Sequence, residues 1–186
     1  MGNSEDEFGY RLWDLVNKKI VRNRDVSSWN ALIAGYVQHG LGEKSLKCLR
    51  QMQDAGVCPD AVTYVSVLKA CSILRAIQSG RTIHNEIIQC GLEVDSGIGN
   101  TIIDMYAKCG SLEEARCVFE GLPNQDIITW SVMISGYAQH GLGDEALKCY
   151  RQMQDAGVCP NLVTYICVLS ACGIVGSLEV GKDIDA

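Results

Sequence analysis

An internal repeat of 101 residues constrains this chain more than any other feature of its sequence. The string RQMQDAGVCP that begins at Arg50 recurs unchanged from Arg151, and QHGLG that begins at Gln38 recurs from Gln139. Self-similarity at a fixed spacing is the signature of repeat proteins, in which each unit buries its apolar face against its neighbours. The chain is therefore expected to fold as a series of similar units.

The long repeat divides into smaller units of 35, 35 and 31 residues, each with two helical segments. Apolar residues spaced three and four apart predict the helices, while HGLG and a glycine followed by a proline are typical of turns and helix ends. The predicted fold is all-α: an α-solenoid of stacked helix-turn-helix hairpins, a superhelical repeat array. The predicted helices span 29–38, 43–55, 63–72, 79–90, 100–108 and 112–120, in units over 26–60, 61–95 and 96–126, with the pattern restarting over 127–161 and 162–186.

Composition argues against several functional classes. The chain has 186 residues and ten cysteines, but no Cys-x-x-Cys pair, so we interpret the cysteines as small buried residues in a reducing compartment. His84-Asn85-Glu86 has the H-x-E spelling of a zinc deaminase but lacks the cysteine pair that would bind the zinc. We expect no enzyme activity, metal, cofactor or small-molecule substrate.

Neither a membrane span nor a targeting segment is predicted. No apolar run approaches the ~18 residues that cross a bilayer. The acidic start MGNSEDEFGY differs from the basic, then apolar, start of a secretory signal and from the acid-poor transit peptides. We interpret this start as mid-protein sequence or a truncated product.

Several strings closely resemble the repeats of plant-type pentatricopeptide repeat proteins. They are VSSWNALIAGYVQHG, IGNTIIDMYAKCGSLEEARCVFEGLP and ITWSVMISGYAQHGLGDEALKCYRQMQDAGVCPN. The 35/35/31 alternation resembles the PLS class of that family, without the DYW deaminase domain that often follows its repeats. The resemblance implies P-type repeats at 26–60 and 127–161, an L-type repeat at 61–95, an S-type repeat at 96–126, a truncated L-type repeat at 162–186 and a degenerate short repeat at 1–25.

The resemblance implies binding of single-stranded RNA, one base per repeat, with two side chains selecting each base. The matching pairs are Asn30 with Asp60 and Asn100 with Asp126 for uracil, with cytosine tolerated, and Ser131 with Asn161 for adenine. An amide can donate and accept toward uracil, an aspartate behind it can fix its orientation, and a hydroxyl leaves room for a purine. Because Val65 of the second repeat cannot hydrogen-bond a base, the predicted core target is 5′-UNUA-3′.

Apolar side chains that would sandwich the bases are implied at Val62, Ile128 and Val163, whereas Ser27 and Gly97 depart from that pattern. The alternative interpretations are local. Asn30 and Asn100 could be helix N-caps or solvated residues, and Asp60, Asp126 and Asn161 could be turn residues.

The formal charge of −6 argues against nucleic-acid binding, because phosphate contacts favour basic proteins. Net charge describes the distant field, however, and Lys69, Arg75 and Lys108 lie near first helices, which line the inner surface in this kind of stack. Even so, we expect weak binding, because only about three repeats would read a base. The resemblance implies a specificity factor for organelle RNA processing or C-to-U editing, in a mitochondrion or plastid, with other RNA-processing proteins as partners, including a deaminase supplied in trans. A protein-binding scaffold and a non-functional fragment stay open as alternatives.

Overall fold

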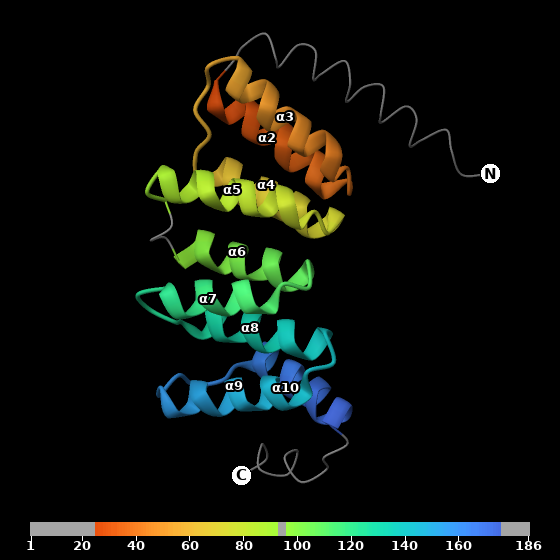
Figure 1. Ribbon diagram of the computed structural model, residues 1–186, viewed down its shortest axis with the longest axis vertical. Coiled ribbons are helices and arrows are strands. Elements are labelled where there is room, and N and C mark those ends of the chain that lie inside the picture. Colours follow the sequence, from red (N-terminus) through yellow and green to blue (C-terminus); the bar gives the residue numbers. More distant parts are fainter. Residues whose placement is uncertain (1–24, 93–95, 176–186) are drawn as a thin grey trace, which may run out of the picture. The chain divides into compact units, whose positions relative to one another are not determined.

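The computed structural model describes residues 25–92 and 96–175, and within these two ranges all regular structure is helical, as predicted. The predicted units over 1–25 and at the end of 162–186 lie wholly or partly outside the described residues. The described helices are α2 (Val26–Gln38), α3 (Gly42–Asp54), α4 (Ala61–Leu74), α5 (Ile77–Gln89), α6 (Ser96–Lys108), α7 (Leu112–Gly121), α8 (Ile127–Gln139), α9 (Gly143–Asp155) and α10 (Leu162–Val175) (Figure 1).

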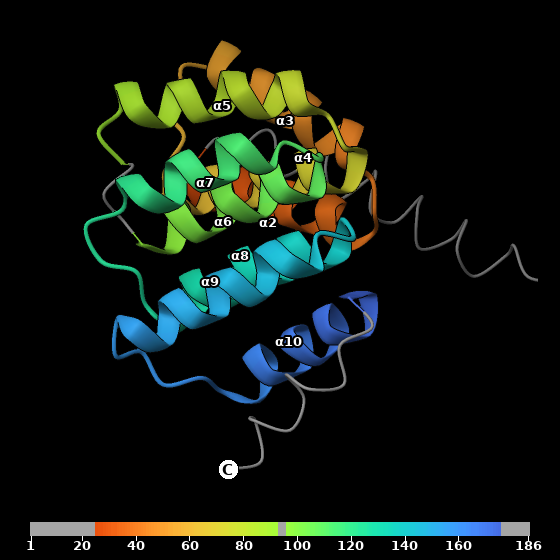
Figure 2. The ribbon, with the colours of Figure 1, turned by 60° about the horizontal axis from the view of Figure 1, so that its bottom comes forward.

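The chain divides into two compact units, residues 1–74 and 75–186. In the first, α2, α3 and α4 all pack against one another. In the second, α8 packs between α6 and α10, while α7 and α9 form a second layer beside them (Figure 2). The division falls between α4 and α5, inside the predicted 61–95 repeat, at Arg75, which adopts a left-handed backbone conformation with φ of 51°.

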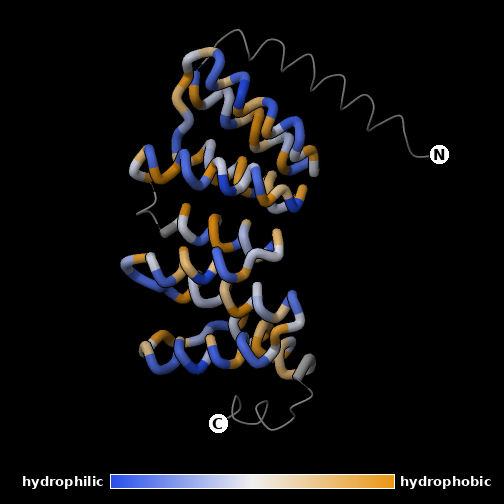
Figure 3. Tube along the Cα trace, in the orientation of Figure 1, coloured by the Kyte–Doolittle hydropathy of each residue, from blue (hydrophilic) through white to orange (hydrophobic). Residues whose placement is uncertain are grey.

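The core of each unit follows the helical periodicity of the sequence. Both apolar and polar residues occur along the helices (Figure 3), and most of the large apolar side chains among the described residues are buried. In the first unit Ile33 and Met52 are fully buried, and their copies 101 residues later, Ile134 and Met153, are fully buried in the second unit. These two core positions are therefore buried to the same degree in both copies of the repeat.

The first helices begin earlier than the sequence predicted. Helix α2 begins at Val26 rather than Trp29, and α6 begins at Ser96 rather than at Asn100. For α2 the reason is an N-cap outside the apolar pattern: the carboxylate of Asp25 accepts a hydrogen bond from the backbone N–H of Ser28 at 2.8 Å. Asn30 therefore lies inside α2, and the interpretation of Asn30 or Asn100 as an N-cap is wrong.

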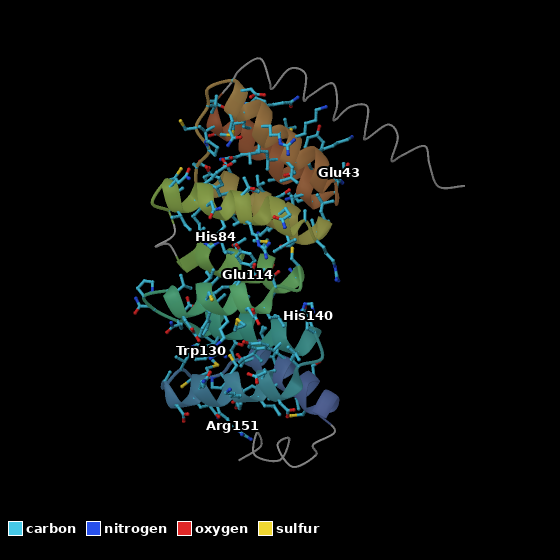
Figure 4. The ribbon with its side chains drawn as sticks, in the orientation of Figure 1. Glu43, His84, Glu114, Trp130, His140 and Arg151 are labelled. Atoms are coloured by element: carbon cyan, nitrogen blue, oxygen red, sulfur yellow. The ribbon has the colours of Figure 1, made fainter. Side chains whose placement is uncertain are left out.

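The turn between α8 and α9 shows why HGLG separates two helices. Gly141 has φ of +75°, and the N–H of Leu142 reaches back to the carbonyl of Tyr137 at 3.0 Å, which closes the end of α8. His140 in this turn (Figure 4) makes a 2.6 Å hydrogen bond from Nε2 to the carbonyl oxygen of Ala107 at the end of α6. The turn thus also ties one hairpin to the preceding one.

The cysteines correct one prediction. Burial was expected for all ten, but only Cys48, Cys71, Cys149 and Cys172 are buried, whereas Cys58, Cys90, Cys117 and Cys159 are exposed. Cys58 and Cys159 lie in the loops that join one hairpin to the next, where no second layer covers them. Burial of the Cys48 thiol raises its pKa to about 11, and burial of the Cys149 thiol raises its pKa to about 12.

Among the described helices, none combines the length and the apolar character that crossing a membrane requires.

Candidate functional site

The structure brings Asn30 and Asp60 into direct contact although 30 residues separate them. The Asn30 amide nitrogen donates to both carboxylate oxygens of Asp60, at 2.9 and 3.1 Å. The amide oxygen of Asn30 accepts from the Thr63 hydroxyl at 2.5 Å. Asn30 is buried and Asp60 half-buried, so both ends of the amide are held in one orientation.

Asp60 also caps the helix that follows it. Its carboxylate accepts from the backbone N–H of Thr63 at 2.9 Å, at the start of α4. Partial burial raises the pKa of Asp60, but the hydrogen bonds from the Thr63 N–H, the Asn30 amide and the Thr63 hydroxyl outweigh it and hold the pKa below its ordinary value. The carboxylate is therefore charged at neutral pH.

Asn100 and Asp126 form a related pair in the second unit. Asp126 is the N-cap of α8, accepting from the backbone N–H of Thr129 at 2.8 Å. That hydrogen bond is the main cause of the lowered pKa of Asp126; burial acts in the opposite direction, while the hydroxyl of Thr129 and the side chain of Asn100 lower it further. The amide oxygen of Asn100 is buried and has no hydrogen-bond partner among the residues that the structure describes.

Ser131 and Asn161 are linked through a third residue rather than directly. The Oγ of Ser131 lies 2.8 Å from the Oγ1 of Thr164, and the Thr164 hydroxyl donates to the Asn161 amide oxygen at 3.1 Å. Asn161 caps α10 by accepting from the backbone N–H of Thr164 at 2.9 Å. Ser131 is buried, whereas Asn161 is exposed to solvent.

Each selecting pair therefore meets a buried threonine that the sequence analysis did not single out. Thr63, Thr129 and Thr164 are each fully buried and stand three residues after Asp60, Asp126 and Asn161. The signal was present as Asp-x-x-Thr or Asn-x-x-Thr, the spelling of an N-cap that bonds the third residue of the helix. The turn interpretation of Asp60, Asp126 and Asn161 is replaced by a capping role.

The three predicted sandwiching residues are exposed to nearly the same degree. Val62, Ile128 and Val163 have 57, 56 and 57% of their surface accessible. Each is the second residue of a first helix, next to a cap residue whose pairing is described above. Isolated exposed apolar side chains are ordinary, but a recurrence at equivalent positions leaves three matching apolar surfaces open to a ligand.

A cavity of about 270 Å³ lies in the second unit, between residues of α6, α8 and the start of α10. It is close to the lower end of the roughly 300–1,000 Å³ typical of ligand pockets. Four of the predicted site residues line it: Ile128, Ser131, Asn161 and Val163. The remaining lining residues are Asp104, Ala107, Lys108, Val132, Ser135, Gly136 and Gln139.

Two small residues that line the cavity pack closely where α6 and α8 approach. A Cβ added to Gly136 would lie 2.9 Å from the Cβ of Ala107. The apolar end of the cavity carries Ile128 and Val163, with the Ser131 hydroxyl and the Asn161 amide near them as polar groups. A flat ligand with an apolar face and hydrogen-bonding edges suits such a lining.

In the part of the chain that the structure describes, no group of three or more histidine, cysteine, aspartate or glutamate side chains could hold a metal ion. His84, from the H-x-E spelling, makes a 3.0 Å hydrogen bond from Nδ1 to the hydroxyl of Tyr106 and an edge-on ring contact with it. His84 therefore contributes to the packing of α5 against α6.

Comparison with known proteins settles the family. A model of the PPR repeat family matches residues 24–72 and again 125–173, two segments 101 residues apart that cover more than half of the chain. A model of the PPR repeat also matches residues 100–127. The chain belongs to the pentatricopeptide repeat family.

The curated relatives are longer pentatricopeptide repeat-containing proteins of Arabidopsis thaliana. One is 42% identical over 161 residues, which cover 87% of this chain and 22% of the relative. A second, described as mitochondrial, is 40% identical over 162 residues, which cover 87% of this chain and 23% of the relative. The chain thus spans less than a quarter of the length of these relatives.

Solved pentatricopeptide repeat structures share the fold. The crystal structure of the pentatricopeptide repeat protein PPR10 in complex with an 18-nucleotide psaJ RNA element matches with a TM-score of 0.72 and 22% identity, over 86% of this chain and 24% of that one. Nuclear proteinaceous RNase P 2 from A. thaliana matches with a TM-score of 0.61 and 12% identity, over 84% of this chain and 36% of that one. The chain therefore has the all-α helical-repeat solenoid fold.

Proposed function

We propose that this chain binds single-stranded RNA sequence-selectively, one base per repeat, with the repeat boundaries predicted above. The observation that carries the proposal is the cavity in which Ser131, Asn161, Ile128 and Val163 meet. These four residues come from the two consecutive repeats over 127–161 and 162–186, and the pair Ser131 and Asn161 was assigned to adenine. A base between Ile128 and Val163 would stack on apolar surfaces, which contributes about 1–3 kcal/mol per base in aromatic-lined sites.

The uracil assignments draw support from the hydrogen bonds of the first pair. Asp60 accepts from the amide nitrogen of Asn30 and thereby fixes the positions of the donating and accepting ends of the amide. The unpartnered buried oxygen of Asn100 is an acceptor that the imide N–H of uracil could satisfy. With no readout at Val65, the proposed core is 5′-UNUA-3′, with both uracil positions tolerating cytosine.

We further propose that the chain is part of a PLS-class specificity factor for organelle RNA processing or C-to-U editing. Three of the curated relatives are described as mitochondrial, and the matched PPR10 crystal contains RNA. The chain itself binds rather than cleaves in this proposal, and a deaminase would act in trans. The proposed location is a mitochondrion or plastid.

The test is a pair of reciprocal changes of base preference. Asn100→Ser with Asp126→Asn should convert the third position of the target from uracil to adenine, while Ser131→Asn with Asn161→Asp should convert the fourth position from adenine to uracil. Asparagine and aspartate both retain the oxygen that caps the next helix, so the fold is preserved. Binding is measured by titration of labelled RNAs that differ only at these two positions, at low salt.

Asn85→Ser with Asp155→Asn makes the same chemical changes at exposed positions outside the proposed pairs and serves as the control. The proposal predicts switched preference for each swap and unchanged preference for the control. Equal, sequence-independent binding by all variants would refute the base assignments. A failure of the unaltered chain to bind any of the RNAs would refute RNA binding itself and favour the protein-binding scaffold.

A further inference from the structure

The end of the cavity away from Ile128 and Val163 carries two side-chain pairs at equivalent places on neighbouring helices. On α6, the Lys108 ammonium donates to the Asp104 carboxylate at 2.8 Å. On α8, the Gln139 amide donates to the Ser135 hydroxyl at 3.0 Å. Both pairs are four residues apart, and all four residues line the cavity.

The α6 pair is charged and the α8 pair is neutral, although the two helices have the same length and are packed together. A neutral pair therefore satisfies the helix at this place, and an ion pair is not needed to form it. Exposed ion pairs of this kind contribute only about 0.3–0.5 kcal/mol to helix stability. The charges on Asp104 and Lys108 thus call for an explanation other than folding.

Among the described residues that line the cavity, Lys108 carries the positive charge and Asp104 the negative one. The two side chains are 47 and 32% exposed, so both can meet a ligand in the cavity. A nucleotide whose base lies near Ser131 and Asn161 brings an anionic phosphate with it. Lys108 would attract that phosphate and Asp104 would repel it. The Lys108 ammonium is already paired with the Asp104 carboxylate.

We propose that Asp104 restrains RNA binding by holding Lys108 away from the phosphate backbone, so that the Asp104–Lys108 pair sets how strongly this repeat contributes to affinity. The inference rests on the proposed function and concerns the regulation of the same site. The Asp104–Lys108 pair would be one local reason why this chain, with a net charge of −6, attracts the phosphate backbone of RNA only weakly. In consequence, affinity would depend more on the fit of the bases and less on non-specific phosphate contacts.

The experiment compares Asp104→Asn, Lys108→Gln and the double variant in RNA titrations from 50 mM to 1 M salt. Asp104→Asn should bind the 5′-UNUA-3′ RNA about three- to ten-fold more tightly at low salt, the size of one interaction between unit charges about 4 Å apart in bulk water. Its dependence on salt should steepen by up to about 0.7 released counterions. The gain should vanish near 1 M salt, where the screening length is about 3 Å.

Glu113→Gln is the matched control, because Glu113 is exposed on α7, does not line the cavity and changes the net charge equally. Asp104→Ser, which copies the residue at the equivalent place in α8, is a second variant if asparagine disturbs the helix. The gain should be lost in the Lys108→Gln background, since Asp104 is proposed to act through Lys108.

Three outcomes overturn the proposal. Asp104→Asn could bind no more tightly than the unaltered chain, Glu113→Gln could show the same gain, or the gain could persist without Lys108. If base preference still switches with the Ser131 and Asn161 variants in those cases, RNA binding stands and only the role of Asp104 fails. If the unaltered chain binds no RNA, the proposed function and this inference fail together.

Discussion

In two of the three pairs, a buried threonine in the next helix joins helix capping to the proposed base selection. The Thr63 hydroxyl donates to the amide oxygen of Asn30 and accepts from the backbone N–H of Asp60. The Thr164 hydroxyl lies 2.8 Å from the Oγ of Ser131 and accepts from the backbone N–H of Asn161. The threonine is fully buried, so its hydroxyl cannot exchange these partners for water. Two selecting residues that are 30 positions apart in sequence thus share contact with one buried hydroxyl.

The role of the threonine is tested by Thr63→Val, which keeps the shape of the side chain and removes the hydroxyl. The buried amide oxygen of Asn30 would lose its donor, and an unsatisfied buried polar atom costs about 1–3 kcal/mol. We expect a loss of that size in the free energy of unfolding, measured by urea denaturation. The control Thr82→Val removes an exposed hydroxyl on α5 and should change the free energy of unfolding by less than about 0.5 kcal/mol.

The caps also predict how stability responds to acid. The folded-state pKa of Asp126 lies below its ordinary value. The charged carboxylate therefore contributes fully to the free energy of unfolding above the ordinary pKa of ~3.9, and this contribution is lost as pH falls through the lowered pKa. Asp126→Asn keeps the capping oxygen but does not titrate. Melting temperatures measured from pH 7 to pH 2 should fall less steeply for Asp126→Asn than for the unaltered chain. Parallel curves would contradict the assignment.

At the scale of the helical element, glycines act in two different ways. Gly141 ends α8 in a left-handed conformation, while Gly173 lies within α10, and neither has a neighbour within 4 Å of an added Cβ. Both positions therefore have room for an added Cβ, and they differ in backbone conformation. Alanine is disfavoured in the first case and favoured over glycine in the second.

Gly141→Ala should accordingly lower the free energy of unfolding by about 1 kcal/mol, because φ of +75° strains a residue with a Cβ. Gly173→Ala should raise it by up to about 1 kcal/mol. Both values are obtained from urea titrations followed by helical circular dichroism. Equal effects of the two substitutions would show that the turn does not retain its left-handed residue.

The equivalent helices α4 and α10 differ in what covers them. Leu68 is fully buried, whereas its copy Leu169 is 54% exposed. Leu68→Ala should lower the free energy of unfolding by about 2–5 kcal/mol because it opens a cavity. Leu169→Ala should lower it by less than about 0.5 kcal/mol. Chemical denaturation of both variants checks this, and a similar cost at both positions would mean that Leu169 is buried in solution.

For the whole molecule, thiol chemistry reports which surfaces the assembled hairpins leave open. Cys58 and its copy Cys159 are exposed, whereas Cys48 and its copy Cys149 are buried with raised pKa values, which lowers the reactive thiolate fraction further. Iodoacetamide at pH 7.5 should modify the first two before the second two, as read by mass spectrometry of digests. The unfolded chain in urea should lose this order.

Much of the fold was predictable because its signals are local. Apolar spacing, the HGLG turn and the 101-residue recurrence predicted the helices to within a few residues, and α3 and α9 begin one residue from the predicted start of the second helix. The first helices were predicted to begin too late, because Asp25 and its equivalents lie outside the apolar pattern and act through the side chain. A capping pattern carries no hydrophobic signal.

The sequence alone determined the repeating helical hairpins and the positions of the pairs, since both depend on residues close together or on exact recurrence. Tertiary structure alone decided that Thr63 meets Asn30, that Ser131 and Asn161 share a cavity with Lys108, and that copies such as Leu68 and Leu169 differ in burial. The physical reason is that burial and side-chain contacts depend on which helix packs alongside. Two identical strings have the same local preferences but can have different neighbours.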